Sequence, residues 1–357
     1  MEKGMGSKGR NVAIDLAKFV MAVFVVAIHV RPFSGWLAFM VDDCITRLAN
    51  PMFFVISSYF LFYRLETERV QNGDAKWKAG LLRNYVKRLL VLYTALFLLN
   101  LPNVLRLVEF GGMKDFVVRL LQFYFLSGPS YTALWFLPAL IWGVTFTFWM
   151  GRETRPWVAL LAGVPLYALT VLDGDYTIFV KEAAWFQFLV DGFKAIFLWL
   201  ANGLTYGLCY CALGACVAVG NVRKGERSEE EKRECRTRFG VGTCIFLVLY
   251  IVECVLIKRY QWGAGFGAQF MMIPFAYVCL QLLLVLEMKE RPIYRFLQKM
   301  SIVIFGIQFL VISGLGKLFR ECRWYMESTT AQFVIVLVVT SAIAAVVVWV
   351  SEHVRTS

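Results

Sequence analysis

The sequence predicts an all-α fold, a polytopic membrane helical bundle of about ten transmembrane helices. The mean hydropathy is +0.63, and 59% of the 357 residues are hydrophobic while only 17% are charged. A spanning helix needs roughly 20 mostly apolar residues, and stretches of that kind recur along the whole chain. These observations exclude a water-soluble enzyme of ordinary composition. Residues 1–357 therefore form a single integral membrane domain.

Each predicted span is an apolar stretch bounded by polar or helix-breaking residues. The first follows Lys3, Lys8 and Arg10 and has no small-residue cleavage site after it, so it reads as a retained helix and not as a removed signal peptide. No strong internal repeat relates the halves of the chain. The ten spans lie near 12–30, 44–63, 86–105, 133–150, 156–172, 202–220, 239–257, 268–287, 300–318 and 331–350.

The distribution of basic residues predicts that both termini are cytosolic. An even number of spans places the two ends on one side, and cytosolic connections carry an excess of Lys and Arg. The connections after the second and sixth spans are the most basic. The second of these, residues 221–238, mixes both signs of charge and reads as a cytosolic loop or helical extension. Most of the net charge of +12 thus reflects the excess of basic residues in cytosolic connections. No nucleic-acid partner is expected, because no soluble basic domain is present.

Two further stretches are apolar and aromatic but interrupted by polar residues. They lie near 116–127 and 185–200, and we expect them to be re-entrant or surface-lying helices on the outer side. Nine cysteines are present without paired metal-type CxxC motifs, so no metal site is expected. The chain has two histidines, and His353 lies in the polar tail.

The first span contains the residues best suited to chemistry. Asp15, Lys18 and His29 are ionisable side chains in an apolar stretch, where they are costly and therefore mark a candidate functional site. At ~100° per residue all three share one helix face, and Lys18 and His29 are separated by roughly 16 Å along the axis. A histidine with a pKa near neutrality suits the deprotonation of a hydroxyl. His29 is therefore the candidate general base, with Lys18 and Asp15 as accessory catalytic residues.

The same residues also fit a purely structural interpretation. Asp15 and Lys18 would then pair near the interface, and His29 would hydrogen-bond a neighbouring helix. A carrier or exporter without chemistry is a further alternative, in which the three side chains form a proton relay or a site for a polysaccharide or a small polar solute. A sensor or scaffold would tolerate replacement of all three.

Four motifs in order resemble the membrane acyltransferase-3 family. The first span is similar to the family's pattern of a basic residue, ten residues and a histidine, which Lys18 and His29 match. The second span resembles PxFFxxSGyxL, with Ser58 in place of the usual glycine. Two departures are Val91, where a second arginine is frequent after Arg88, and Gln308, where the family often has histidine. The other matching segments are residues 14–16, 133–140 and 202–214.

The resemblance implies an O-acyltransferase that moves an acyl group, acetyl by default, from cytosolic acetyl-CoA to a hydroxyl of an envelope carbohydrate or similar acceptor on the outer side. Acyl-CoA is then a donor substrate, with no permanently bound cofactor, and the cell membrane is the expected location. The basic residues Arg83, Lys87 and Arg88 begin the third span on the cytosolic side and are candidates for binding the CoA phosphates. Ordinary positive-inside flanking is the other interpretation, and for any one of these residues it is slightly favoured. Whether an acyl-histidine intermediate forms stays open.

Overall fold

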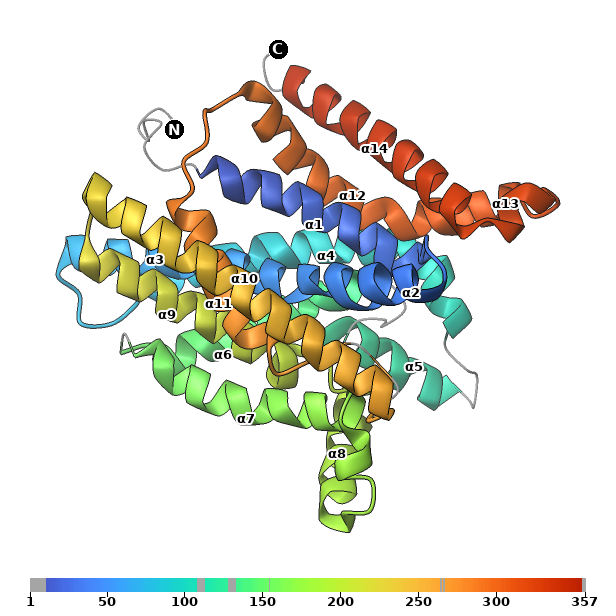
Figure 1. Cartoon of the computed structure of the whole chain (residues 1–357), viewed down its shortest axis with the longest axis horizontal. Helices are drawn as coiled ribbons and strands as arrows, with labels where there is room; N and C mark the ends of the chain where they lie inside the picture. Colours follow the sequence, from blue (N-terminus) through green and yellow to red (C-terminus); the bar gives the residue numbers. More distant parts are fainter. Residues whose placement is uncertain are drawn as a thin grey trace.

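The computed structural model describes residues 11–107, 113–127, 133–153, 155–263, 265 and 267–354. Helices make up 85% of the structure, and the described part contains no strand. Nine helical segments within it are long and apolar enough to cross a membrane. The predicted all-α membrane bundle is therefore confirmed (Figure 1).

The main helices alternate in direction along the chain. Their bounds are α1 Val12–Val30, α3 Ala49–Asn72, α4 Ala79–Leu107, α6 Phe136–Gly151, α7 Pro156–Gly174, α9 Leu208–Lys224, α10 Glu229–Tyr260, α11 Met272–Val285, α12 Pro292–Leu318 and α14 Thr329–His353. The eighth predicted span, near 268–287, corresponds to α11, which has only 14 residues and is preceded by irregular chain. The structure thus supplies nine full-length candidate spans and one shorter apolar helix.

Short helices extend or connect these elements. Helix α2 (Gly35–Ala38), a π-helical segment (Phe39–Cys44) and a 3₁₀ helix (Ile45–Leu48) lead continuously into α3. Similar short turns precede α6 (Ala133–Trp135) and α9 (Gly203–Gly207), and another follows α7 (Thr177–Phe179). Helix α5 (Met113–Gln122) continues into a π-helical segment (Phe123–Ser127), and α13 (Arg323–Glu327) precedes α14.

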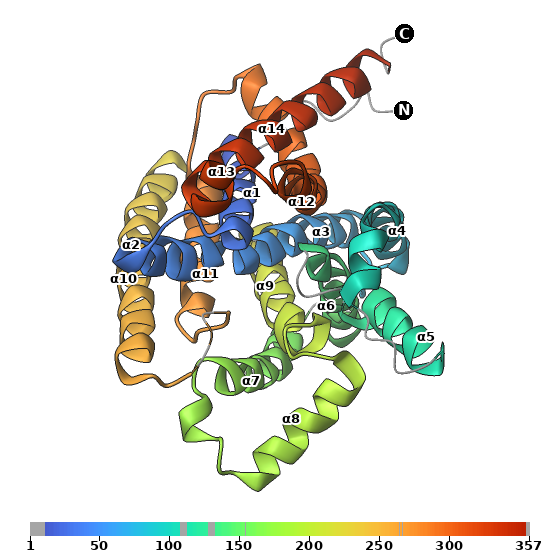
Figure 2. The ribbon, with the colours of Figure 1, turned by 90° about the vertical axis from the view of Figure 1, so that its right-hand side faces the viewer.

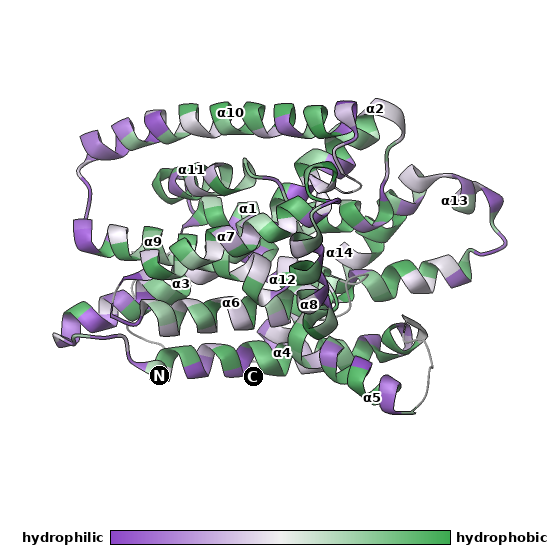
Figure 3. Ribbon diagram, turned by 90° about the horizontal axis from the view of Figure 1, so that it is seen from below, coloured by the Kyte–Doolittle hydropathy of each residue, from purple (hydrophilic) through white to green (hydrophobic). Residues whose placement is uncertain are grey.

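Helix ends are fixed by side chains that the sequence supplies. Asn11 caps α1, accepting from the Ile14 N–H at 3.0 Å and donating to the Leu283 carbonyl at 2.8 Å. Helix α10 begins with a capping box between Ser228 and Glu231. Residues 221–224 complete α9, and α10 starts at Glu229, so most of the charged segment 221–238 is helical extension. Its polar end is visible in Figure 3.

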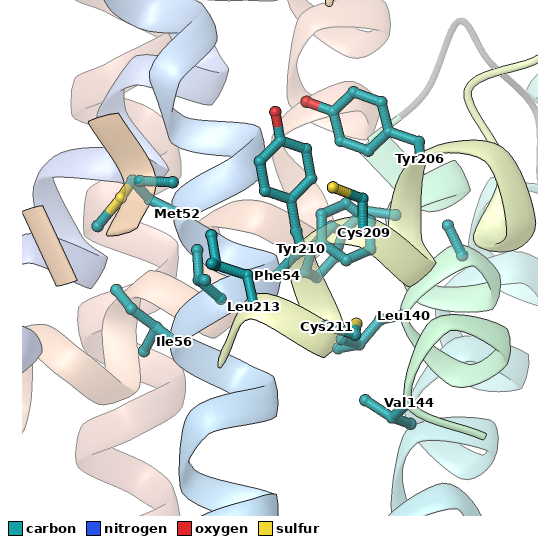
Figure 4. Packing of buried hydrophobic residues seen from close by; sticks show 14 of the residues in the cluster. Met52, Phe54, Ile56, Leu140, Val144, Tyr206, Cys209, Tyr210, Cys211 and Leu213 are labelled. Carbon is teal, nitrogen blue, oxygen red and sulfur yellow. The ribbon is translucent and has the colours of Figure 1, made fainter. Parts of the chain in front are cut away.

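Helices α3 and α9 pack closely at the centre of the bundle. A Cβ atom on Gly214 would overlap Ser58 Oγ, so only glycine allows α9 to approach α3 here. Ser58 is fully buried and donates to the Val55 carbonyl at 3.1 Å. Ser58 is therefore accommodated by a glycine on the facing helix. Figure 4 shows the apolar and aromatic side chains of this core around Phe54 and Tyr210.

Two helices lie outside the set of aligned spans. Helix α8 (Ala184–Phe197) crosses the direction of its neighbours, as Figures 1 and 2 show. It exposes Trp185 and Phe188, while Phe186 is buried. Helix α5 is likewise short and amphipathic, with Asp115 and Arg119 near its ends. Both fit the predicted surface-lying helices at the end of the bundle opposite Val12.

Candidate active site

His29 lies in the last turn of α1 and lines a cavity of about 240 Å³. Its ring meets that of Phe309 on α12 edge-on, with centroids 6.1 Å apart. The cavity is at the end of the bundle where α3, α6 and α9 begin. Its wall also includes Arg47, Asn50, Trp135, Phe136, Trp199, Tyr206, Gly267 and Phe305. His29, the predicted general base, therefore lines a partly open cavity that a small molecule can enter.

Several polar groups of the wall have no hydrogen-bond partner among the described residues. They are the buried atoms Arg47 Nε, Trp199 Nε1 and the Tyr206 hydroxyl. Buried polar atoms are nearly always hydrogen-bonded in folded proteins, so an exception calls for an explanation. Two of these three groups are obligate donors. The wall of the cavity is thus mostly aromatic but carries a few polar groups that face no partner.

Lys18 and Asp15 do not line this cavity. The Lys18 ammonium lies 4.9 Å from the centre of the Phe60 ring on α3, a cation–π arrangement. Asp15 is buried in the first turn of α1, with 6% of its surface exposed. The structure places both side chains toward the opposite end of α1 from His29. The shared helix face is therefore present, but the three residues do not form one compact site.

Aromatic rings lie between Lys18 and the cavity. Phe53 is two turns from Phe60 on α3, and its ring centroid is 5.9 Å from Phe136 and 6.1 Å from Phe305. Phe136 and Phe305 are themselves 5.6 Å apart and line the cavity floor. A chain of atoms that reached His29 from the Lys18 side would have to displace these rings.

Arg83, Lys87 and Arg88 are exposed near the start of α4. They are at the opposite end of the bundle from His29, and none of them lines the cavity. A groove of about 890 Å³ is present at that same end, between α1, α3, α10 and α11. Its cations are matched by acids, since Arg64 is 3.9 Å from Glu68 and Lys232 is 3.0 Å from Glu287. Phe60 lines this groove and contacts Lys18.

The segment before α11 that closes the cavity is held by two buried acids. Asp175 accepts from the Ala268 N–H at 3.2 Å and from Gln269 Nε2 at 2.6 Å. Glu253 on α10 accepts from the N–H groups of Phe270 and Met271, both at 2.8 Å. Burial raises the pKa of Asp175 to about 7, and the Ala268 hydrogen bond opposes that rise. Gly267 is fixed on the cavity wall in this way.

The two departures from the family motifs have different surroundings. Val91 is 64% exposed on the outside of α4, so an arginine there would not face the cavity. Gln308 is fully buried on α12, donates to the Phe305 carbonyl at 3.3 Å and leaves Oε1 without a partner in the described part of the chain.

Arg47 was missed by sequence reasoning. The signal that singled out Lys18, a charge in an apolar stretch, applies equally to Arg47 at the start of the second span. Trp199 and Tyr206 could not be assigned to the site, because aromatic residues are common throughout such chains.

The fold and the cavity define an integral membrane protein with an ionisable site buried among its spans. The chain belongs to the acyltransferase-3 family: the model of this family, described as an acyltransferase domain, matches residues 11–349. No solved structure matches this chain significantly.

Curated relatives carry the names of racemases. An amino-acid racemase of Enterococcus faecalis is 32% identical over 172 residues, covering 47% of this chain and 23% of that protein. A serine/alanine racemase of Enterococcus gallinarum is 25% identical over 344 residues, covering 93% of this chain and 45% of that protein. The chain thus spans less than half the length of the curated relatives it matches.

Proposed function

We propose that this protein transfers an acyl group, acetyl by default, from cytosolic acyl-CoA to a hydroxyl of an envelope carbohydrate or similar acceptor on the outer side of the cell membrane. The observation that supports this most is His29 on the wall of a cavity, in a chain of the acyltransferase-3 family. The positive-inside rule supports cytosolic termini and an outward-facing cavity.

His29 acts as the general base in this proposal. Its neutral imidazole accepts the proton of the acceptor hydroxyl as that oxygen attacks the acyl carbonyl carbon. The tetrahedral intermediate then collapses, the carbon–sulfur bond breaks, and the histidinium returns the proton to the departing CoA thiolate. Lys18 and Asp15 would set the polarity of the donor's route at the other end of α1.

The donor has to approach from the end that carries Arg83, Lys87 and Arg88. These exposed side chains form no ion pair with described residues, so they are available for the polyanionic phosphates of CoA. The pantetheine arm would pass between helices toward His29 and displace the rings of Phe53, Phe136 and Phe305. Binding energy from the distant nucleotide can offset such a rearrangement.

A carrier is the second candidate, and the names of the relatives favour it. Proteins named for reactions on amino acids match this chain over only part of their length, so the matched part can serve solute passage. In that case the cavity binds a polysaccharide unit or a small polar solute such as an amino acid, and no acyl-CoA is consumed.

The two candidates are separated by one experiment on the purified protein in detergent. Release of free CoA from acetyl-CoA, with envelope glycans as acceptors, is followed for the wild type, His29→Ala and His29→Gln. We expect release by the wild type and a loss of at least ~100-fold in both variants, the usual scale of general-base removal. Matching melting curves control for folding. Full activity in a folded His29→Ala protein would remove the general-base role, and no release by any protein would favour the carrier.

A further inference from the structure

Arg47 is a cation without a counter-charge in the cavity wall. It lies on the 3₁₀ helix Ile45–Leu48 and shares the cavity with His29. Its side chain forms no hydrogen bond or ion pair with any residue that the structure describes, and its Nε is buried. Arg47 as a whole is half-buried, and a buried guanidinium nitrogen without a hydrogen-bond partner is costly. The arrangement therefore requires a reason beyond folding.

Three carboxylates act on Arg47 through their charges, and none of them is hydrogen-bonded to it. Asp42 is buried and accepts from the Phe33 N–H at 3.3 Å. Asp43 forms an ion pair with Arg31, at 2.8 Å between Nη2 and Oδ1. Asp175 accepts from the Ala268 N–H at 3.2 Å and from Gln269 at 2.6 Å. The guanidinium thus keeps its donors for a group that enters the cavity.

A second donor lies in the same wall. The indole N–H of Trp199 is buried and has no partner in the described part of the chain. Indole and guanidinium nitrogens only donate hydrogen bonds, so both groups require oxygen acceptors on the ligand. Guanidinium groups match carboxylate and phosphate oxygens in charge and in geometry.

We propose that the acceptor carries an anionic group, a carboxylate or a phosphate, which Arg47 binds while the acceptor's hydroxyl faces His29. This inference rests on the proposed function for the role of the hydroxyl, whereas the binding of the anion does not depend on catalysis. A cavity of about 240 Å³ is below the usual range for drug-sized ligands. The unit that enters is accordingly small, a single sugar acid or a hydroxy acid.

The test measures ligand binding by thermal unfolding of the purified full chain, without acyl-CoA. The probes are matched pairs: glucuronate and glucose, 3-hydroxybutyrate and 1,3-butanediol, and glycerol phosphate and glycerol. We expect at least one anionic member to stabilise the wild type more than its neutral partner does. Arg47→Gln should weaken that binding at least ten-fold, the scale of a charge-assisted hydrogen bond, and Arg47→Lys should retain part of it. The pair that responds distinguishes carboxylate from phosphate.

Arg259→Gln is the matched control, because Arg259 is an exposed arginine at the same end of the bundle and outside the cavity. It should bind as the wild type does. Ligand-free Arg47→Gln should be at least as thermostable as the wild type, whereas an arginine with a structural role would lower stability when removed. The inference is overturned if no anionic probe exceeds its neutral partner, or if the preference survives Arg47→Gln. If the protein transfers acyl groups to neutral acceptors at full rate and binds no anion, only this inference is contradicted. If it binds the anion but releases no CoA, only the proposed function is contradicted.

Discussion

At the scale of single residues, the buried carboxyl of Asp175 beside the cavity wall makes the stability of the fold depend on pH. Asp175 is 1% exposed and accepts hydrogen bonds from Ala268 and Gln269. Burial is the main cause that raises its pKa to about 7 from an ordinary 3.8. The native state therefore holds a proton that the unfolded state has already lost between these two pH values. Stability from this group is fully present below pH ~3.8 and is lost as the pH rises through about 7.

Asp175→Asn should remove this dependence. The difference between the two pKa values corresponds to at most roughly 4 kcal/mol. We expect the melting temperature of the wild type to fall between pH 5 and pH 8, and that of the variant to fall less. At pH 8 the variant should be at least as stable, because its side chain cannot ionise. Melting curves of both proteins at the two pH values measure this, and an equal fall in both would contradict it.

The sequence predicts individual site residues from the free-energy cost of burying a charge, and their catalytic roles stay predictions. Asp15, Lys18 and His29 stood out because charges are rare in apolar stretches, and His29 indeed faces the cavity. Their common helix face did not make them one site, since Phe53, Phe136 and Phe305 come from three other helices and fill the space between. Contacts of that kind depend on how helices pack, which periodicity within one helix cannot reveal.

At the scale of elements, α3 separates two surfaces that could receive the donor. The basic residues of α4 are exposed, and the groove beside Tyr63 and Arg64 lies between α3 and the helices α1 and α11. Figure 2 shows α4 and α11 on opposite sides of α3. The cations of the groove are paired with glutamates, so the groove attracts the negative charges of CoA only weakly. The basic residues of α4 form no ion pair with any residue that the structure describes, and we expect them to bind the phosphates of CoA.

Arg83→Gln combined with Lys87→Gln should raise the KM for acetyl-CoA about ten-fold, with a smaller change in kcat. The two side chains are one turn apart on α4 and together lose two charge-assisted contacts. Acetyl-pantetheine lacks the nucleotide phosphates, so its turnover should not change, which controls for damage to the fold. Lys232→Gln in the groove is the matched control. If Lys232→Gln raises the KM for acetyl-CoA and the double variant leaves it unchanged, the donor binds in the groove instead.

The limits of the helices follow the length of the apolar stretch in some places and tertiary contacts in others. The stretches near 12–30 and 156–172 became α1 and α7 with nearly the same limits. The stretch 268–287 became the shorter α11, because Glu253 bonds the N–H groups of Phe270 and Met271 and so fixes where the helix begins. That acid lies on another helix, and nothing in the local sequence indicates the contact.

At the scale of the whole molecule, the proposed mechanism requires the two ends of the bundle to face different compartments. Hydrogen bonds between helices fix which termini share an end. Lys232 near the start of α10 bonds Glu287 beyond α11, and Lys299 near the start of α12 bonds Glu352 near the end of α14, at 3.0 and 2.5 Å. At the opposite end Thr330 bonds the Pro32 carbonyl at 2.5 Å. The His29 cavity is at the end with Pro32.

Two cysteines report on this orientation without any substitution. Cys235 lies in the charged first part of α10, and Cys322 lies between α12 and α13 at the cavity end, both partly exposed. In intact cells a membrane-impermeant maleimide should label Cys322, and Cys235 only after permeabilisation, as quantified on the cysteine-containing peptides by mass spectrometry. Exposed Cys244 lies in the apolar middle of α10, where the lipid bilayer keeps a membrane-impermeant reagent away from it. If Cys235 is labelled first, the topology is the opposite of the one proposed and His29 is on the cytosolic side. Acyl-CoA would then reach His29 without passing the rings of Phe53, Phe136 and Phe305.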